Sequence, residues 1–299
     1  ERPRDDVDRA LEAAHAHAPA AVRSRVSVHP AASVVGMSEH PREAIRKRKD
    51  SSMRIAIDLL KEGRAEAMVS AGNTGALTAM AHFVLKTLGP VERAPIMSAV
   101  PARNGGQTHM LDLGANTRAT AIQLAQFATM GCIVARDVYG IADPRVGLLN
   151  IGEEDTKGHE IVQEAHELIR ASGLNYLGFV EGNHIFEENV DVVVTDGFTG
   201  NVALKSMEGL AKLIVEQLRA EFTRNAFTKM SALLARPVLR RVGEKLDPRR
   251  YNGACMVRLT AVVVKSHGSA DRVAFAQAVA TAATAMRRGL PAAIAKALS

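Results

Sequence analysis

Short apolar runs alternate with longer amphipathic stretches along the whole chain. Runs rich in Val, Ile and Leu predict buried strands, whereas apolar residues spaced by three or four positions predict helices. The predicted strands are 25–30, 65–71, 95–101, 107–113, 145–151, 174–180, 191–195 and 256–265. The predicted helices are 5–18, 41–60, 74–88, 119–141, 158–172, 201–246 and a final Ala-rich segment.

Local signals divide or end several of these elements. Asp50-Ser51-Ser52 provides side chains that cap a new helix within the first long helical stretch. Asn104-Gly105-Gly106 predicts a hairpin between two successive strands. Gly173 is a favourable residue for a helix C-terminus. Pro237 predicts a break in the longest helix, because proline has no amide proton to donate within a helix.

The alternation of strands and helices predicts an α/β protein, a three-layer α/β/α sandwich with a mainly parallel sheet. The sequence contains no internal repeat, low-complexity tract or Pro/Gly-rich linker. Residues 1–299 are therefore predicted to form a single domain. Residues 202–250 are predicted to protrude from it as a helical excursion.

Composition places the chain among globular proteins. Apolar residues make up 47% and charged residues 23% of its 299 residues, and no apolar run reaches the ~20 residues of a membrane span. The sequence begins with Glu1, and no signal peptide is visible. Cys132 and Cys255 lie far apart and outside any CxxC or Cys/His pattern, which disfavours a zinc site and a disulfide scaffold. A reducing cytoplasm is therefore the expected location.

The formal net charge of +6 favours acidic partners such as phosphate, an acidic carrier protein or an anionic lipid surface. This excess is too small to require nucleic acid. Aromatic residues amount to only 4%, so the stacking residues of a single-strand binder are also missing. No nucleic-acid partner is expected.

Four loops rich in small polar residues each follow a predicted strand and precede a predicted helix. They are 70–75, 150–158, 195–201 and 265–269. In a parallel sheet such loops meet at the carboxyl ends of the strands, where ligands bind. Glycines allow close approach, helix N-termini attract anions, and Lys157, Lys205 and Lys265 add positive charge. The loops predict an anion site, although none matches a P-loop or a Rossmann fingerprint.

Individual residues at these loops are candidates for the site. The predicted catalytic residues are Lys265, His267, Lys205 and Asn201. The predicted substrate-binding residues are Ser52, Gly72, Asn73, Thr74, Gly75, Asp112, Asn116, Gly152, Glu153, Lys157, Asp196, Gly197, Gly200, Ser266 and Gly268. Three alternatives stay open: His267 satisfies loop carbonyls, Asp196 only caps the next helix, and Glu153 and Glu154 only suit a helix dipole.

The chain shows no sign of a covalent acyl-enzyme. It has no GxSxG nucleophile elbow, and neither cysteine adjoins a histidine. If acyl transfer occurs, the acceptor is expected to attack directly. The protein then supplies positioning and stabilisation of the developing oxyanion.

Two basic segments suggest contact surfaces. Arg236, Arg240 and Arg241 are interspersed with the apolar residues Leu233, Leu234, Val238 and Leu239. This pattern predicts shallow contact with an anionic membrane, and a dimer contact is the alternative. The run Lys47-Arg48-Lys49 fits either a solvated helix face or a docking site for an acidic carrier protein.

Six ordered motifs resemble the phosphate acyltransferases of bacterial phospholipid synthesis, the PlsX family, over nearly the whole chain. They are Arg48-Lys-Asp-Ser-Ser-Met53, Val69-Ser-Ala-Gly-Asn-Thr-Gly-Ala-Leu77, Leu111-Asp-Leu-Gly-Ala-Asn116, Val146-Gly-Leu-Leu-Asn-Ile-Gly-Glu-Glu154, Asp196-Gly-Phe-Thr-Gly-Asn-Val-Ala-Leu-Lys205 and Val264-Lys-Ser-His-Gly-Ser269.

This resemblance implies a homodimer with a fold like that of isocitrate dehydrogenase and phosphotransacetylase. It implies acyl carrier protein as donor, inorganic phosphate as acceptor, acyl phosphate as product, and no metal or organic cofactor. It also implies a membrane-touching helical hairpin near 225–250 and a downstream glycerol-phosphate acyltransferase that uses the acyl phosphate. The expected location is the cytoplasm, at the inner face of the cell membrane.

The sequence departs from the family pattern in two places. The family's opening strand and Asp-x-x-Gly-Gly-Asp loop are not in it, and Thr117-Arg-Ala-Thr-Ala121 replaces an Asp-Cys-Lys-Pro-like run. Two other functions therefore stay open. One is a phosphotransacetylase-like enzyme that uses acyl coenzyme A, or a dehydrogenase on the same fold. The other is a catalytically weak scaffold at the membrane.

Overall fold

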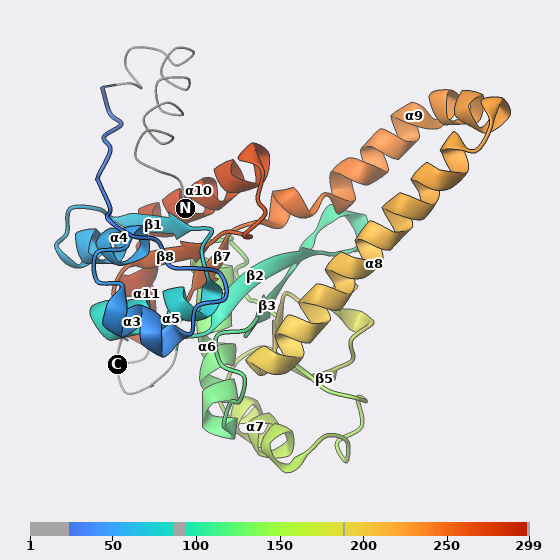
Figure 1. Ribbon diagram of the computed structural model, residues 1–299. Coiled ribbons are helices and arrows are strands. Elements are labelled where there is room, and N and C mark those ends of the chain that lie inside the picture. The colour runs from blue at the N-terminus through green and yellow to red at the C-terminus, as the bar shows by residue number, and fades with distance from the viewer. Residues whose placement is uncertain (1–23, 87–93, 188, 298–299) are drawn as a thin grey trace.

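A computed structural model describes residues 24–86, 94–187 and 189–297, which form one eight-stranded sheet with helices packed against it (Figure 1). The strands are β1 (Ala67–Ser70), β2 (Ile96–Pro101), β3 (Gln107–Leu111), β4 (Val146–Leu149), β5 (Tyr176–Val180), β6 (Val192–Val194), β7 (Ala254–Met256) and β8 (Val262–Lys265). The helices are α3 (Pro41–Lys47), α4 (Ser52–Lys61), α5 (Thr74–Leu85), α6 (Ala121–Asp137), α7 (Glu160–Arg170), α8 (Gly197–Thr223), α9 (Ala226–Leu246), α10 (Arg272–Arg287) and α11 (Leu290–Ala297).

The strand order is β1-β8-β7-β2-β3-β6-β4-β5. Four neighbouring pairs are parallel, β1 with β8, β3 with β6, β6 with β4, and β4 with β5. Three pairs at the centre are antiparallel, β8 with β7, β7 with β2, and β2 with β3. The sheet is thus mixed. Two sets of parallel strands, β1 with β8 and β3 with β6, β4 and β5, are joined through antiparallel pairings with β7 and β2.

Two apolar clusters, one on each face of the sheet, make the three layers. Val192 and Val194 of β6 pack with α6, α7 and α10 on one face, whereas Val193 of the same strand packs with α4, α5 and α8 on the other. Alternate residues of a strand point to opposite faces, so a wholly apolar strand such as β6 indicates a sheet covered on both sides. The predicted α/β/α sandwich is confirmed.

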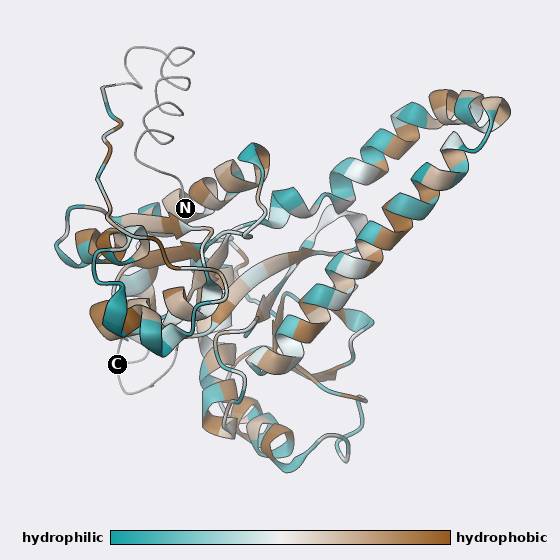
Figure 2. Cartoon of the chain, in the orientation of Figure 1, coloured by the Kyte–Doolittle hydropathy of each residue, from teal (hydrophilic) through white to brown (hydrophobic). Residues whose placement is uncertain are grey.

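α8 and α9 form a hairpin that projects beyond the sandwich (Figure 1). Apolar and polar residues are mixed along both helices, as the alternating colours of Figure 2 show. Phe227, Leu234 and Val238 are 81%, 78% and 55% exposed. Leu233 is exposed as well. Leu239 is half-buried, so it is not one of the exposed apolar residues of the hairpin. No described helix is both long enough and apolar enough to cross a bilayer.

Most predicted elements are confirmed, including the division of the first long helix, where Ser51 caps α4. The helical break was misplaced: α9 continues through Pro237, and the chain reverses at Asn225, which forms a capping box with Thr228. The predicted helix 5–18 lies outside the described residues.

Three further predictions require correction. Residues 25–30 form no strand, because Val26 and Val28 are exposed and have no strand to pair with among the described residues. Residues 256–265 are not one strand: Met256 ends β7, a turn with Arg258 at a φ of 81° reverses the chain, and β8 begins at Val262 antiparallel to β7. The final Ala-rich segment is two helices, divided at Gly289 with a φ of 63°.

Candidate active site

The three antiparallel pairings divide the predicted site loops into two groups. The carboxyl ends of β1 and β8 lie at the opposite edge of the sheet from those of β3, β6 and β4. The prediction that four loops meet at one edge is therefore wrong, because it assumed that all the strands point the same way.

The turn after β8 lies directly against the turn after β1. The amide of Ser266 donates to the carbonyl of Ser70 at 2.9 Å. A Cβ built on Gly268 would lie 3.6 Å from the carbonyl oxygen of Ala71. The turn after β8 is therefore in contact with the turn after β1. The first contains Lys265, Ser266, His267 and Gly268, and the second contains Gly72 to Gly75.

Helix α8 brings Lys205 to this place from the other group of loops. α8 starts at the carboxyl end of β6 and runs back across the sheet, so the eight helical steps from Gly197 to Lys205 cover about 12 Å. Lys205 Nζ lies 3.5 Å from His267 Nε2. Lys205, Lys265 and His267 form what we call the cationic cluster. Asn201, one turn earlier on the same face of α8, lies beside Gly114.

Lys265 is the most perturbed cation of the cluster. Burial, and secondarily the neighbouring charge of Lys205, lower the pKa of the Lys265 ammonium from 10.5 to about 8. Its Nζ donates to the carbonyl oxygen of Ser266. Glu208 pairs with Lys205 at 2.8 Å, whereas the partly buried ammonium of Lys265 has no carboxylate partner among the ion pairs of the described residues and favours a bound anion.

His267 is held with one ring nitrogen as an acceptor. The amide of Ser269 donates to Nδ1 at 3.2 Å, so in the neutral ring the proton is assigned to Nε2. Burial and the nearby Lys205 lower the pKa of His267, which keeps the ring neutral at pH 7. Nε2–H then lies 3.5 Å from the Lys205 ammonium, which cannot accept from it, and 3.9 Å from the Glu208 carboxylate. This arrangement makes His267 a hydrogen-bond donor toward the cluster.

The side-chain amide of Asn73 is hydrogen-bonded within the protein. Its Nδ2 donates to the carbonyls of Gly36, Met37 and Glu39 at 3.1, 2.9 and 2.9 Å, and its Oδ1 accepts from Ala76 as the cap of α5. The side chain is 8% exposed. Both polar atoms of the side chain are engaged, which fits a positioning role for Asn73, and its direct contact with an anion stays a prediction.

Asp112 and Asn116 organise the end of β3. The Asp112 carboxylate accepts from the amides of Ile96, Gly114, Ala115 and Asn116 and from Asn116 Nδ2. Burial raises the pKa of Asp112 against these hydrogen bonds.

Two glycines of α8 pack on this same loop. A Cβ on Gly200 would lie 2.0 Å from the Asp112 carbonyl oxygen, and one on Gly197 would lie 2.6 Å from that of Asn116. These two glycines allow close backbone packing rather than approach of a ligand.

Side chains cap three of the four helix N-termini that follow the predicted loops, those of α5, α8 and α10, whereas His159 makes no capping hydrogen bond at α7. Asp196 accepts from the amides of Phe198 and Thr199, both at 2.9 Å, at the start of α8. Asp271 accepts from Ala274 at the start of α10. A carboxylate cap satisfies the amides and repels a second anion. Asp196 thus caps α8, as one of the two interpretations predicted, and positive charge at the cationic cluster comes from side chains.

The loop after β4 stands apart from the cationic cluster. Five strand spacings separate β4 from β8, which is about 24 Å. Glu153 pairs with His184 at 2.7 Å, and Asn150 Nδ2 donates to the Lys157 carbonyl. A Cβ on Gly152 would lie 2.9 Å from Lys157 Cγ. Gly152, Glu153 and Lys157 are therefore not brought to the cluster.

The remaining predicted residues lie at or just before the starts of α4 and α5. Gly72 and Gly75 pack against side chains, with built Cβ atoms 2.8 Å from Met53 Cε and 3.0 Å from Pro41 Cγ. Thr74 opens α5. Ser52 opens α4, where its amide donates to the Ser33 carbonyl.

Two residues of the site were missed from the sequence. Asn252 accepts from the His267 amide at 2.9 Å and donates to Ser266 Oγ at 2.8 Å, which fixes the turn after β8. In the sequence, the dipeptide Asn252-Gly253 indicates a turn, and this is the feature that could have drawn attention to Asn252. Glu208 pairs with Lys205 at 2.8 Å, and the helical i, i+3 spacing could have revealed it.

Comparison with known proteins adds to this geometry. The family described as "Fatty acid synthesis protein" matches residues 5–293. The phosphate acyltransferase of Alkalilimnicola ehrlichii is 55% identical over 267 residues, 89% of this chain and 78% of that protein. The phosphate acyltransferase of Alcanivorax borkumensis is 52% identical over 289 residues, 96% and 85% of the two chains. The chain belongs to the phosphate acyltransferase family, and it is an enzyme.

Solved structures with a similar fold support the architecture alone. A phosphotransacetylase from Streptococcus pyogenes aligns with a TM-score of 0.54 at 18% identity, covering 82% of this chain and 70% of that one. A branched-chain phosphotransacylase from Enterococcus faecalis aligns with a TM-score of 0.50 at 14% identity, covering 84% and 81%. The phosphotransacetylase-like fold that the sequence predicted is confirmed.

Proposed function

We propose that this member of the phosphate acyltransferase family transfers a fatty acyl group from acyl carrier protein to inorganic phosphate. The cationic cluster is the observation that carries the proposal. Two ammonium groups and a hydrogen-bond donor converge there from α8 and from the turn after β8. Such a set fits a small oxyanion beside a polarised carbonyl.

In the proposed reaction Lys205 and Lys265 bind phosphate, and one phosphate oxygen attacks the thioester carbonyl carbon. The C–O bond forms as the carbonyl becomes a tetrahedral oxyanion, which Nε2–H of His267 and the Lys265 ammonium stabilise. The C–S bond then breaks. The carrier leaves as a thiolate, and the acyl group leaves as acyl phosphate.

Direct attack agrees with the state of the cysteines. Both Cys132 and Cys255 are buried, and burial raises the pKa of each thiol to about 12. A thiol with such a pKa stays protonated and is a poor nucleophile. Neither cysteine is therefore suited to carry the acyl group.

The function is tested by mixing the chain with acyl carrier thioester, with and without phosphate. We expect phosphate-dependent release of free carrier thiol, and Lys265→Met should slow it about 10²–10³-fold. The phosphotransacetylase-like fold makes acyl coenzyme A the alternative donor. Faster turnover with that thioester would favour this second function, and vesicle binding without any turnover would favour a scaffold.

The α8–α9 hairpin is the proposed contact with an anionic membrane surface. Leu233, Leu234 and Val238 are exposed there beside the exposed Arg236 and Arg241. Apolar side chains among arginines suit shallow insertion next to anionic headgroups. We place the enzyme at the inner face of the cell membrane, as a homodimer. A glycerol-phosphate acyltransferase there would consume the acyl phosphate.

A further inference from the structure

A strap formed by residues 33–40 runs beside the cationic cluster, and nothing in the proposed reaction accounts for it. It precedes α3 and has no regular secondary structure apart from one isolated bridge, between Ser33 and Ser51. Even so, its backbone is fixed by the side chain of Asn73 and by that of the strap's own Glu39.

Asn73 anchors the centre of the strap. One amide group donates to three strap carbonyls, those of Gly36, Met37 and Glu39. Because Asn73 also caps α5, it ties the strap to the turn after β1.

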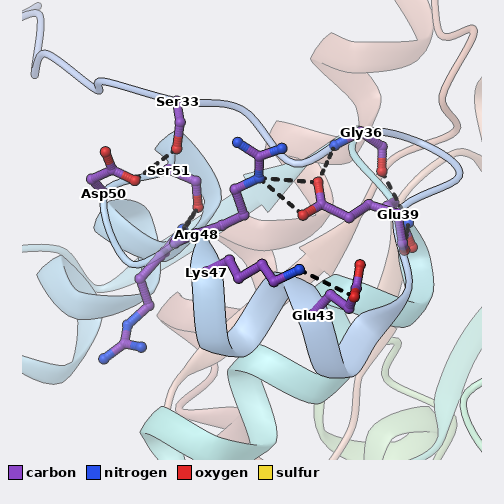
Figure 3. A network of polar contacts seen from close by, with 10 residues as sticks. Ser33, Gly36, Glu39, Glu43, Lys47, Arg48, Asp50 and Ser51 are labelled. Carbon is purple, nitrogen blue, oxygen red and sulfur yellow. Dashed lines mark hydrogen bonds and ion pairs between the residues drawn. The ribbon is translucent and has the colours of Figure 1, made fainter.

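An ion pair anchors the end of the strap from the other side (Figure 3). Glu39 Oε1 accepts from Arg48 Nε at 2.9 Å, and Oε2 accepts from the amide of Gly36 at 3.1 Å. Arg48 and the Gly36 amide lower the pKa of the Glu39 carboxyl, which keeps it charged at neutral pH. The carboxylate thus closes the strap into a tight loop.

The side chain of Met37, in this fixed loop, is large, apolar and exposed to solvent. Met37 is 65% exposed although its carbonyl is anchored. Its Cε lies close to the turn after β8, since a Cβ on Gly268 would be only 3.1 Å away. Gly268 follows His267 directly, so an apolar methyl group stands at the rim of a charged site.

We propose that Met37 is a specificity-determining residue, a wall against which the first methylenes of the acyl chain pack. This inference rests on the proposed function, because it requires an acyl thioester at the cationic cluster. Glu39 of the strap and Asn73 of the turn after β1 are positioning residues that act through Met37. A thioether side chain suits this task, because it is flexible, polarizable and apolar.

The test compares acetyl, medium-chain and long-chain carrier thioesters as donors for the wild-type chain and for Met37→Ala. We expect KM for the medium- and long-chain donors to rise about three- to tenfold, relative to the acetyl donor, since apolar contact area is lost. The value of kcat should change less than KM. Met37→Leu should restore most of the selectivity.

Two further variants separate positioning from general damage. Glu39→Gln should raise the same KM values, and the double variant with Met37→Ala should be no worse than Met37→Ala alone. Leu168→Ala removes an exposed aliphatic side chain of α7 and should change nothing.

A uniform loss with all donors, or unchanged KM values in Met37→Ala, would overturn the role of Met37. A wild-type chain inactive with every donor would instead refute the proposed function, and the role of Met37 with it.

Discussion

Lys205 and His267 lie 62 positions apart in the sequence, yet their Nζ and Nε2 atoms are 3.5 Å apart. Lys205 comes from the third turn of α8, and His267 follows β8. The reversed centre of the sheet makes this contact possible. It places the carboxyl end of β8 at the edge toward which α8 runs.

Replacing Lys265 by Met should separate activity from stability. Turnover should fall about 10²–10³-fold, as for the loss of one oxyanion donor. The unfolding midpoint should rise, because the variant no longer holds a partly buried ammonium next to Lys205. Thermal unfolding and thiol release measure the two effects. A lower midpoint with full turnover would contradict the role of Lys265.

The pH profile should report the lowered pKa of Lys265. Activity that needs its ammonium should fall as pH rises through about 8. In Lys265→Arg this limb should move to higher pH, since arginine stays charged.

The stability of the fold should change in the opposite direction over the same range. The folded pKa of Lys265 is below its unfolded value of 10.5, so between about 8 and 10.5 the unfolded chain binds more protons. This group therefore makes stability rise with pH in that window. Lys265→Met should remove this contribution, and denaturant titrations at several pH values measure it.

His267 should act as a donor rather than as a base. His267→Gln keeps an N–H donor and should retain more turnover than His267→Ala, which should lose about 10²-fold. A steady-state comparison of kcat for the two variants decides the matter. Equal loss in both would indicate proton transfer by the ring.

Loss of the Asn73 amide should be costly for folding. Asn73→Ala removes a helix cap and leaves three carbonyls without their donor. The free energy of unfolding should fall by about 2–4 kcal/mol. Urea titration measures the change. Asn175→Ala, which removes an exposed hydrogen bond to Asp143, is the matched control and should cost far less.

Charges placed on the hairpin should abolish vesicle binding without loss of chemistry. Leu233→Asp with Leu234→Asp should prevent sedimentation with anionic vesicles, whereas thiol release in solution should remain. Ile161→Asp with Leu168→Asp, on α7, is the matched control. Vesicle binding by the hairpin variant would show that another surface contacts lipid.

Local signals in the sequence were enough to predict most of the fold. Ser51 caps α4, Gly105 with a φ of 87° turns the hairpin between β2 and β3, and the apolar run of β6 indicated a sheet covered on both faces. The helical break predicted at Pro237 was wrong because the helix around this residue is exposed to water. Water can therefore solvate the carbonyl that proline leaves without an amide partner.

The site was less predictable because it depends on distant pairings. The antiparallel pairing of Ile96 with Met256 sets the direction of half the sheet, and no local pattern records it. Lys265 and His267 could be named from their loop. The engagement of Asn73 by the strap and the distance of Lys157 from the cluster follow only from the assembled fold.

The most direct test of the account measures acyl phosphate and free carrier thiol together during a single incubation with acyl carrier thioester and phosphate. We predict that the two products form in equal amounts, and that formation of both slows about 10²–10³-fold in Lys265→Met. Thiol release that is independent of phosphate, with no acyl phosphate formed, would contradict acyl transfer at the cationic cluster.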